Sequence, residues 1–198
     1  GLAHALQAPA LAWGVLAAVL ALALYVCTGM IYGAVKAIRE WATPLTPINY
    51  TLIGLASGAL LASALAAFMA APLAPGLARL ALVATLVAAV ARGYAYWRNQ
   101  RLVPSTTLQT AIGVRHPRIV QKSQGAMGGS FNTREFFHGR PATLVMRVRW
   151  AAALLGFVLP AAALAATAAP SGPLLALLFV LQYAGLLAER WSFFTEAN

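Results

Sequence analysis

The sequence has only four acidic residues, and three of them stand next to an arginine. Glu189 precedes Arg190 near the end of an apolar stretch, and Glu40 follows Arg39 after another. A carboxylate at a membrane edge is costly to desolvate, so a cationic partner is expected. Each pair can therefore act in one of two ways, as a proton carrier beside a ligand or as a structural ion pair.

The third arginine–glutamate pair lies in the segment Ser130–Gly139, which reads SFNTREFFHG. Glu135 and His138 are three residues apart, so a helix would place them on one face, and Arg134 precedes them. The phenylalanines of the segment would anchor it at the level of the lipid headgroups. The segment is predicted either to handle protons beside an apolar ligand or to dock the loop or a partner as an interfacial element.

Other chemistries lack the residues they need. The single cysteine, Cys27, allows no intrachain disulfide and no cysteine-rich metal site. The histidines lie outside the apolar stretches, so a haem held by two histidines of a helical bundle is not expected. The sequence also lacks zinc-ligand spacing and the GxSxG and HExxH motifs. We therefore expect no haem and no metal centre in this chain.

These residues must be positioned by a very apolar chain of 198 residues. Hydrophobic residues make up 61% of it and charged residues 9%, against roughly 45–50% and about 25% in soluble domains. So few charges exclude a soluble globular protein and a disordered one. Lipid requires hydrogen-bonded backbone, and no alternating pattern indicates a barrel. We predict one all-α domain over 1–198, an antiparallel bundle of about five transmembrane helices at about 8–35, 50–71, 77–97, 150–169 and 174–191.

The connections between these helices divide the bundle into two sides. Short, uncharged turns at 71–76 and 170–173 define side two, and the long loop 98–149 defines side one. Of the 14 Lys and Arg residues, all except Arg79 and Arg92 fall on side one, as do all four acids. The positive-inside rule then places side one in the cytoplasm. Basic residues there are predicted to dock a partner by charge complementarity: Arg98, Arg101, Arg115, Arg118, Lys122 and Arg140.

Three features inside the apolar stretches bear on helix packing. Gly54 and Gly58 form a small-xxx-small pattern that allows close approach of two helices. Pro160 is a candidate for a kink. Arg92 is predicted either to extend to side one or to point into the bundle toward a carboxylate.

Three sequence stretches together carry a family resemblance. They are CTGMIY at 27–32 continuing to REW at 39–41 and PINY at 47–50, SFNTREFFHG at 130–139, and LLAERW at 186–191. They resemble the DmsC family, the membrane anchor subunits of dimethyl sulfoxide reductase-type and sulfite dehydrogenase-type complexes. The resemblance implies a haem-free protein of the bacterial cytoplasmic membrane. It further implies a molybdopterin subunit and an iron–sulfur subunit as partners, and electron exchange with menaquinone or ubiquinone.

The sequence departs from the family pattern before its first apolar stretch. The family has further helices there, and a His-Leu-Gly-type motif associated with quinol binding, and this sequence lacks both. We therefore expect the sequence to be a fragment of a longer protein, with part of the quinone site outside it.

The expected mechanism places a quinone beside side one, where it enters laterally from the bilayer. Carboxylates or a histidine exchange its protons, and electrons pass to an iron–sulfur partner on the basic face. The candidate residues are Glu40, Glu135, His138 and Glu189, with Arg39, Arg134 and Arg190 to hold the carboxylates ionised or to bind a quinone oxygen. The alternatives are a purely structural anchor without a quinone site and a small-solute transporter. The helix centres, nearly all Ala, Leu, Val and Gly, count against the transporter.

Overall fold

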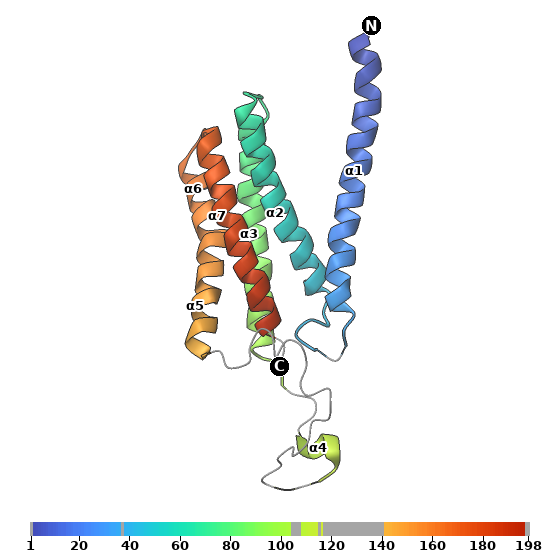
Figure 1. The fold of residues 1–198 in the computed structure, drawn as a ribbon, viewed down its shortest axis with the longest axis vertical. Coiled ribbons are helices and arrows are strands. Elements are labelled where there is room, and N and C mark those ends of the chain that lie inside the picture. The colour runs from blue at the N-terminus through green and yellow to red at the C-terminus, as the bar shows by residue number, and fades with distance from the viewer. Residues whose placement is uncertain (1, 37, 104–107, 115, 117–140, 197–198) are drawn as a thin grey trace.

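A computed structural model describes residues 2–36, 38–103, 108–114, 116 and 141–196. Its helices are α1 (Leu2–Gly33), α2 (Leu45–Phe68), α3 (Ala74–Asn99), α4 (Leu108–Ile112), α5 (Ala142–Ala153), α6 (Leu159–Ala166) and α7 (Gly172–Thr195), and a π-helical segment (Leu154–Val158) joins α5 to α6. Five helices, with α5–α6 counted as one, are long and apolar enough to cross a membrane. The predicted all-α membrane fold is thereby confirmed (Figure 1).

The helix ends differ from the predicted ends by several residues. The fourth spanning helix begins at Ala142 instead of about 150, so the connection from α3 to α5 covers 100–141 instead of 98–149. Arg147 and Arg149 lower the hydropathy of its first turns without ending the helix. Long basic side chains can extend to the headgroups while their backbone stays helical. Hydropathy therefore marks where a chain enters lipid, not where its helix begins.

Proline stands in the first turn of three of the spanning helices. Pro75 and Pro173 are the second residues of α3 and α7, and Pro47 is the third residue of α2. The first N–H groups of a helix have no partner inside the helix, so proline loses nothing at these positions. For this reason α2 begins at Leu45, before the predicted residue 50.

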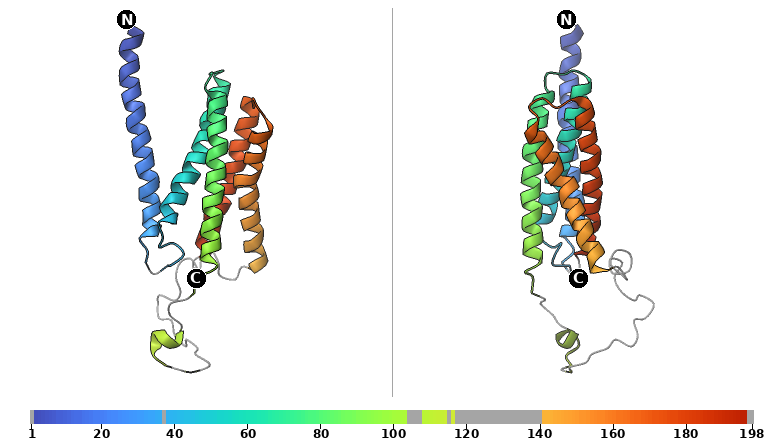
Figure 2. Two further views of the ribbon diagram at one scale, coloured as in Figure 1. Left: turned by 180° about the vertical axis from the view of Figure 1, so that it is seen from behind. Right: turned by 90° about the vertical axis from the view of Figure 1, so that its left-hand side faces the viewer.

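Four of the spanning helices form a ring in which neighbours run in opposite directions. α2 packs against α3 and α7, α5 packs against α7, and α3 packs against α6 and the π-helical segment. α3 and α7 therefore lie diagonally across the ring and run in the same direction, toward side one (Figures 1 and 2). This up-down-up-down order is the usual arrangement of four-helix bundles.

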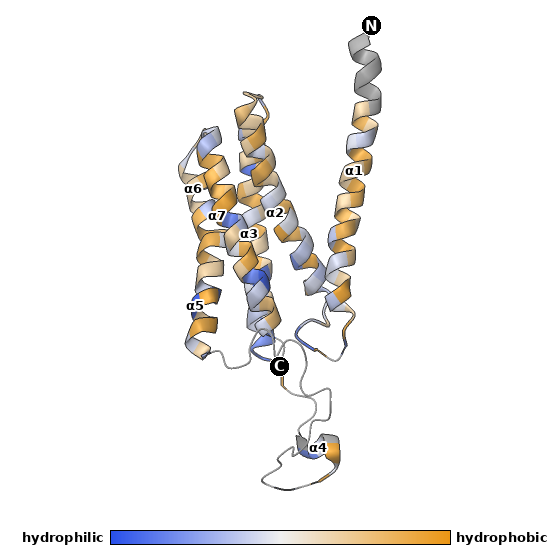
Figure 3. Cartoon of the chain, viewed as in Figure 1, coloured by the Kyte–Doolittle hydropathy of each residue, from blue (hydrophilic) through white to orange (hydrophobic). Residues whose placement is uncertain are grey.

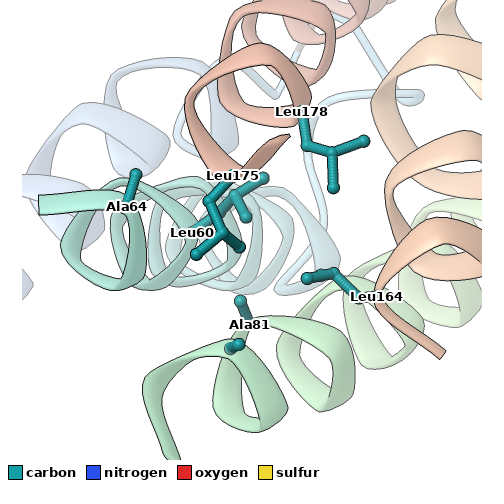
Figure 4. Packing of buried hydrophobic residues seen from close by; sticks show 7 residues of the cluster. Leu60, Ala64, Ala81, Leu164, Leu175 and Leu178 are labelled. Carbon is teal, nitrogen blue, oxygen red and sulfur yellow. The ribbon is translucent and has the colours of Figure 1, made fainter. Parts of the chain in front are cut away.

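The half of the ring near side two is closed by small and branched apolar residues. Leu60 and Leu175 are fully buried, and Ala81 on α3 faces them with no exposed surface. Leu164 and Leu178 complete the same cluster, so all four helices of the ring meet there (Figure 4). These buried side chains stabilise the ring at side two. The polar groups of the ring can therefore lie in its side-one half.

α1 stands apart from the ring along most of its length. It packs against α2 near side one and diverges from it toward side two (Figures 1 and 2). Close approach is possible because a Cβ on Gly54 would lie 2.6 Å from the Tyr25 ring, and one on Gly29 would lie 2.5 Å from Pro47 Cα. Gly54 thus fits the predicted packing role, whereas a Cβ on Gly58 would meet open space.

The π-helical segment adjoins the closest helix contact of the ring. A Cβ added to Gly185 of α7 would collide with the backbone nitrogen of Gly156. Pro160 has no N–H for the carbonyl of residue 156, four positions earlier, and Gln182 Nε2 donates to Gly156 O at 3.3 Å instead. The side chain of α7 thus satisfies a carbonyl that the proline leaves without its usual donor.

Candidate functional site

Polar side chains meet across the centre of the ring at a regular interval. Thr85, Arg92 and Asn99 lie seven residues apart on α3, and Gln182, Glu189 and Glu196 lie seven residues apart toward and just beyond the end of α7. Seven residues bring a helix back to nearly the same face. Two parallel helices with the same spacing therefore meet in three successive polar pairs. We call them the polar ladder: Thr85–Gln182, Arg92–Glu189 and Asn99–Glu196.

The ladder is neutral at its inner end and contains charged side chains toward side one. Its first pair is neutral, with Gln182 Nε2 donating to Thr85 Oγ1 at 3.2 Å. In the second, Arg92 Nε lies 2.5 Å from Glu189 Oε1. In the third, Asn99 Nδ2 donates to Glu196 Oε2 at 3.1 Å. Arg92 is seven residues before the end of α3, about 10 Å along the axis, so the charges stand close to the side-one end of the ring, where Figure 3 shows hydrophilic residues on α3.

Arg92 and Arg190 balance two buried glutamates. Arg92 Nη2 lies 2.7 Å from Glu196 Oε1, and its Nε contacts Glu189. Arg190 holds the other Glu189 oxygen through its Nη2 at 2.5 Å and its Nε at 2.6 Å. Only 4–5% of the two glutamate side chains and 12% of the Arg92 side chain are exposed. Buried charges are tolerated when paired in this way. We call these four residues the ion cluster.

A cavity of about 320 Å³ opens beside the ion cluster, between α3, α5, the π-helical segment and α7. Arg92, Glu189 and Glu196 line its polar end. The remaining wall is largely apolar and includes Ala89, Gly93, Met146, Trp150, Phe157 and Val158. Ligand sites of about 300–1,000 Å³ typically combine such walls with a few polar groups. We call this space the lateral cavity.

The lateral cavity is placed at the lipid-facing edge of the ring. α3 packs against α6 and the π-helical segment, while α5 packs against α7, so α3 and α5 separate toward side one. Trp150 and Met146 of α5 line the cavity and are 70% and 48% exposed. The cavity therefore lies at the outer surface of the ring, between α3 and α5.

A second polar pair, Arg149 of α5 and Tyr96 of α3, also lines the lateral cavity. Arg149 Nη1 donates to Tyr96 Oη at 3.2 Å, and its guanidinium lies 5.1 Å from the Tyr96 ring centroid. Arg149 Nε is buried and has no hydrogen-bond partner among the residues that the structure describes. Two arginines, Arg92 and Arg149, therefore line the lateral cavity.

On its α2 side, the ion cluster borders a much smaller cavity and a cluster of aromatic rings. This small cavity measures about 10 Å³, and its lining includes Glu40, Asn49, Arg92 and Arg190. The Arg190 guanidinium lies 4.2 Å from the ring centroid of Tyr50. Next to Tyr50 pack four further rings, Tyr32, Trp41, Phe193 and Phe194. These rings tie the turn after α1 to the end of α7.

The predicted site residues lie in different places. Glu189 and Arg190 belong to the ion cluster, and Glu40 lines the small cavity. Arg39 donates to the carbonyl of Val103 and lines neither cavity. Arg134, Glu135 and His138 lie outside the described residues. In the described part of the chain, no three His, Cys, Asp or Glu side chains gather as they would around a metal ion.

The predicted docking residues are only partly within the described chain. Arg98 donates to Asn99 Oδ1 at 2.9 Å, and Arg101 stacks on the Trp97 ring at 4.0 Å. Arg115, Arg118, Lys122 and Arg140 lie outside the described residues.

Sequence reasoning did not assign Glu196, Asn99 and Arg149 to the site, and left the orientation of Arg92 open. Arg92 points into the bundle, toward Glu189 and Glu196. The seven-residue spacing of the polar residues along α3 and α7 is visible in the sequence. Assigning the pairs, however, requires knowing that α3 and α7 lie diagonally and run in the same direction.

The helices, the ion cluster and the lateral cavity define a multi-pass membrane protein with a buried charged site near one membrane face. A family model for the DMSO reductase anchor subunit (DmsC) matches residues 2–195. The chain therefore belongs to the DmsC family, as its sequence motifs indicated.

One relative is a sulfite dehydrogenase subunit of Allochromatium vinosum. It is 48% identical over 188 residues, which cover 93% of this chain and 57% of the relative. The chain thus spans little more than half the length of the curated relative it matches. No solved structure matches the chain significantly.

Proposed function

We propose that this chain is a membrane anchor subunit of a molybdopterin- and iron–sulfur-containing oxidoreductase, and that it exchanges electrons with the quinone pool. Membership of the DmsC family supports the anchor role, and the relative's name, which makes it one subunit of a sulfite dehydrogenase, supports an assembly of several subunits. Its partners are then a molybdopterin catalytic subunit and an iron–sulfur subunit. The partners dock on side one, which is cytoplasmic in a bacterial inner membrane.

The observation that carries the quinone proposal is the position of the ion cluster at the end of an apolar cavity open to lipid. A quinone has an apolar tail and a polar ring with two oxygens, so it needs both environments in one site. In this proposal Arg92 and Arg149 donate to the ring oxygens and Glu189 and Glu196 exchange protons, since all four line the cavity. Among the sequence-predicted site residues that the structure describes, Glu189 is the one that lines this cavity.

The redox step is balanced by the partner subunit and the carboxylates. One quinol gives up two electrons and two protons when it becomes quinone, and the reverse step takes up the same numbers. The electrons pass one at a time to an iron–sulfur centre docked at side one. The protons pass to a cavity carboxylate, and a positioned acid–base group of this kind contributes roughly 10²–10⁴-fold to such steps.

A purely structural anchor is the main alternative. It predicts that the ion cluster only ties α3 to α7, with no ligand in the lateral cavity. A small-solute transporter would need polar groups through the middle of the membrane. In the polar ladder of the described helices, the pair nearest the middle of the helices is Thr85–Gln182, which is neutral. This counts against the transporter.

Quenching of tryptophan fluorescence distinguishes a quinone site from a structural anchor. Trp150 lines the lateral cavity, whereas Trp13 lies on α1, which does not line it. The two side chains are equally exposed, at 70%. A hydroxyquinoline N-oxide, a quinol analogue, is expected to quench the full-length protein saturably in detergent. Trp150→Phe is expected to remove most of that quenching, and Trp13→Phe, the matched control, to leave it in place. Absence of saturable quenching, or equal loss in both variants, would contradict the proposed site.

A further inference from the structure

Three of the four acidic residues in the chain gather around one buried arginine. Arg92 lines both cavities, the lateral cavity together with Glu189 and Glu196 and the small cavity together with Glu40. Glu40 is only partly buried and lies in the turn between α1 and α2, on side one. Arg92 therefore stands between the lateral cavity and the small cavity, whose lining includes the partly exposed Glu40.

The small cavity has the size and lining of a site for one water molecule. Its volume of about 10 Å³ is close to the ~10–15 Å³ that one water needs. Two residues that line it carry buried atoms without a hydrogen-bond partner in the described chain, the acceptor Asn49 Oδ1 and the donor Arg190 Nη1. Asn49 is 5% exposed. A water molecule between an acceptor and a donor can satisfy both.

Other residues that line this cavity connect it to the two buried glutamates, Glu189 and Glu196. Asn99 lines it and donates to Glu196, while Arg92 and Arg190 line it and hold Glu189. Each buried carboxylate is thus one side chain away from the water site.

We propose that the small cavity binds a water molecule that connects the ion cluster to Glu40, and that protons of the bound quinone reach or leave the side-one solution through Glu40. The proton route rests on the proposed function. In quinol oxidation, each proton passes from a quinol oxygen to Glu189 or Glu196, then through the water to Glu40, and from there to the solution. The two electrons leave separately to the iron–sulfur partner, and quinone reduction runs the same route in reverse.

The water site is tested without any quinone by X-ray radiolytic labelling of the full-length protein, read by mass spectrometry. Hydroxyl radicals form from bound water, so Tyr50, which lines the small cavity, is expected to label above Phe179, which packs on the apolar core. Asn49→Leu is expected to reduce Tyr50 labelling to the level of Phe179. Asn49→Asp keeps an acceptor and is expected to preserve it. Equal Tyr50 labelling in Asn49→Leu and the unchanged protein would overturn the water site.

The proton route is tested by Glu40→Gln in the assembled complex. Quinol oxidation is expected to slow by about 10²-fold, the lower end of what a positioned acid–base group contributes, while the affinity for the hydroxyquinoline N-oxide stays unchanged. Lys36→Gln is the matched control, since Lys36 is an exposed charge of the same turn that lines neither cavity, and it is expected to change neither quantity.

Two outcomes of the Glu40→Gln experiment overturn the proton route while leaving the proposed quinone function in place. An unchanged rate in Glu40→Gln removes Glu40 from it, and parallel loss of rate and affinity means that Glu40 acts in ligand binding or folding instead. Failure of the unchanged protein to bind the N-oxide would refute the proposed quinone function and the route that depends on it. The labelling experiment would still decide whether the water site exists.

Discussion

At the scale of single residues, Arg92 is the group on which the charged site depends. It contacts Glu189 and Glu196 at once, whereas Arg190 contacts Glu189 alone among the described acids. Without the Arg92 guanidinium, Glu196 would keep only the neutral Asn99 as a partner. Two carboxylates would then share one arginine in an environment that disfavours unbalanced charge.

Arg92→Gln is therefore expected to lower the free energy of unfolding by about 3–5 kcal/mol, the usual cost of removing one partner from a buried ion pair. Arg79→Gln is the matched control, because Arg79 is an exposed residue of the same helix at side two. Unfolding in mixed detergent micelles, followed by circular dichroism, measures both. A loss in Arg92→Gln no larger than that in Arg79→Gln would show that the ion cluster adds nothing to stability.

At the scale of elements, the contact between α7 and the π-helical segment sets the shape of the lateral cavity. Gly156 and Gly185 let the two backbones touch. Phe157 and Val158, the next residues of the π-helical segment, line the cavity. A π-helical turn inserts a residue into the helix and changes which side chains face a neighbour. The close contact thus fixes the orientation of two wall residues.

Gly185→Ala is expected to destabilise the protein by about 1–3 kcal/mol, because the new Cβ would collide with the backbone nitrogen of Gly156, which cannot move alone. It is also expected to weaken N-oxide binding, since the cavity wall shifts with the helix. Gly58→Ala has open space at its Cβ and is the matched control, with stability within about 1 kcal/mol of the original. Equal effects of the two substitutions on denaturation would contradict the close contact.

The elements were predictable from sequence to a greater degree than the site. Runs of apolar residues identify all five spanning helices because lipid imposes hydrogen-bonded helices on the backbone. The association of Glu189 with Arg190 was predictable from their adjacency. The association of Arg92 with Glu196 was not, because the two residues lie 104 positions apart and meet only across the diagonal of the ring. Helix order in space depends on packing that hydropathy does not encode.

At the scale of the whole molecule, the two ends of the ring have opposite character. Side two is closed by an apolar core of Leu60, Leu164 and Leu175. Side one holds the ion cluster, both cavities and the long connection 100–141. If the partner subunits dock at side one, an electron can pass to the iron–sulfur subunit from the side-one end of the lateral cavity. The proposed function therefore requires that both long connections on side one face the same compartment as the partner subunits.

This requirement is tested by cysteine labelling in a Cys27→Ser background. Val114→Cys lies in the connection from α3 to α5, and Ser171→Cys lies in the turn before α7, and both positions are exposed. Because the ring alternates in direction, a membrane-impermeant maleimide is expected to label the two from opposite sides of the membrane. The charge distribution places Val114→Cys in the cytoplasm, so it is expected to react in inside-out vesicles and Ser171→Cys in right-side-out vesicles. Cys27→Ser alone is the unlabelled control. Labelling of both from one side would contradict the helix order, and exchange of the two sides would place the ion cluster away from a cytoplasmic partner.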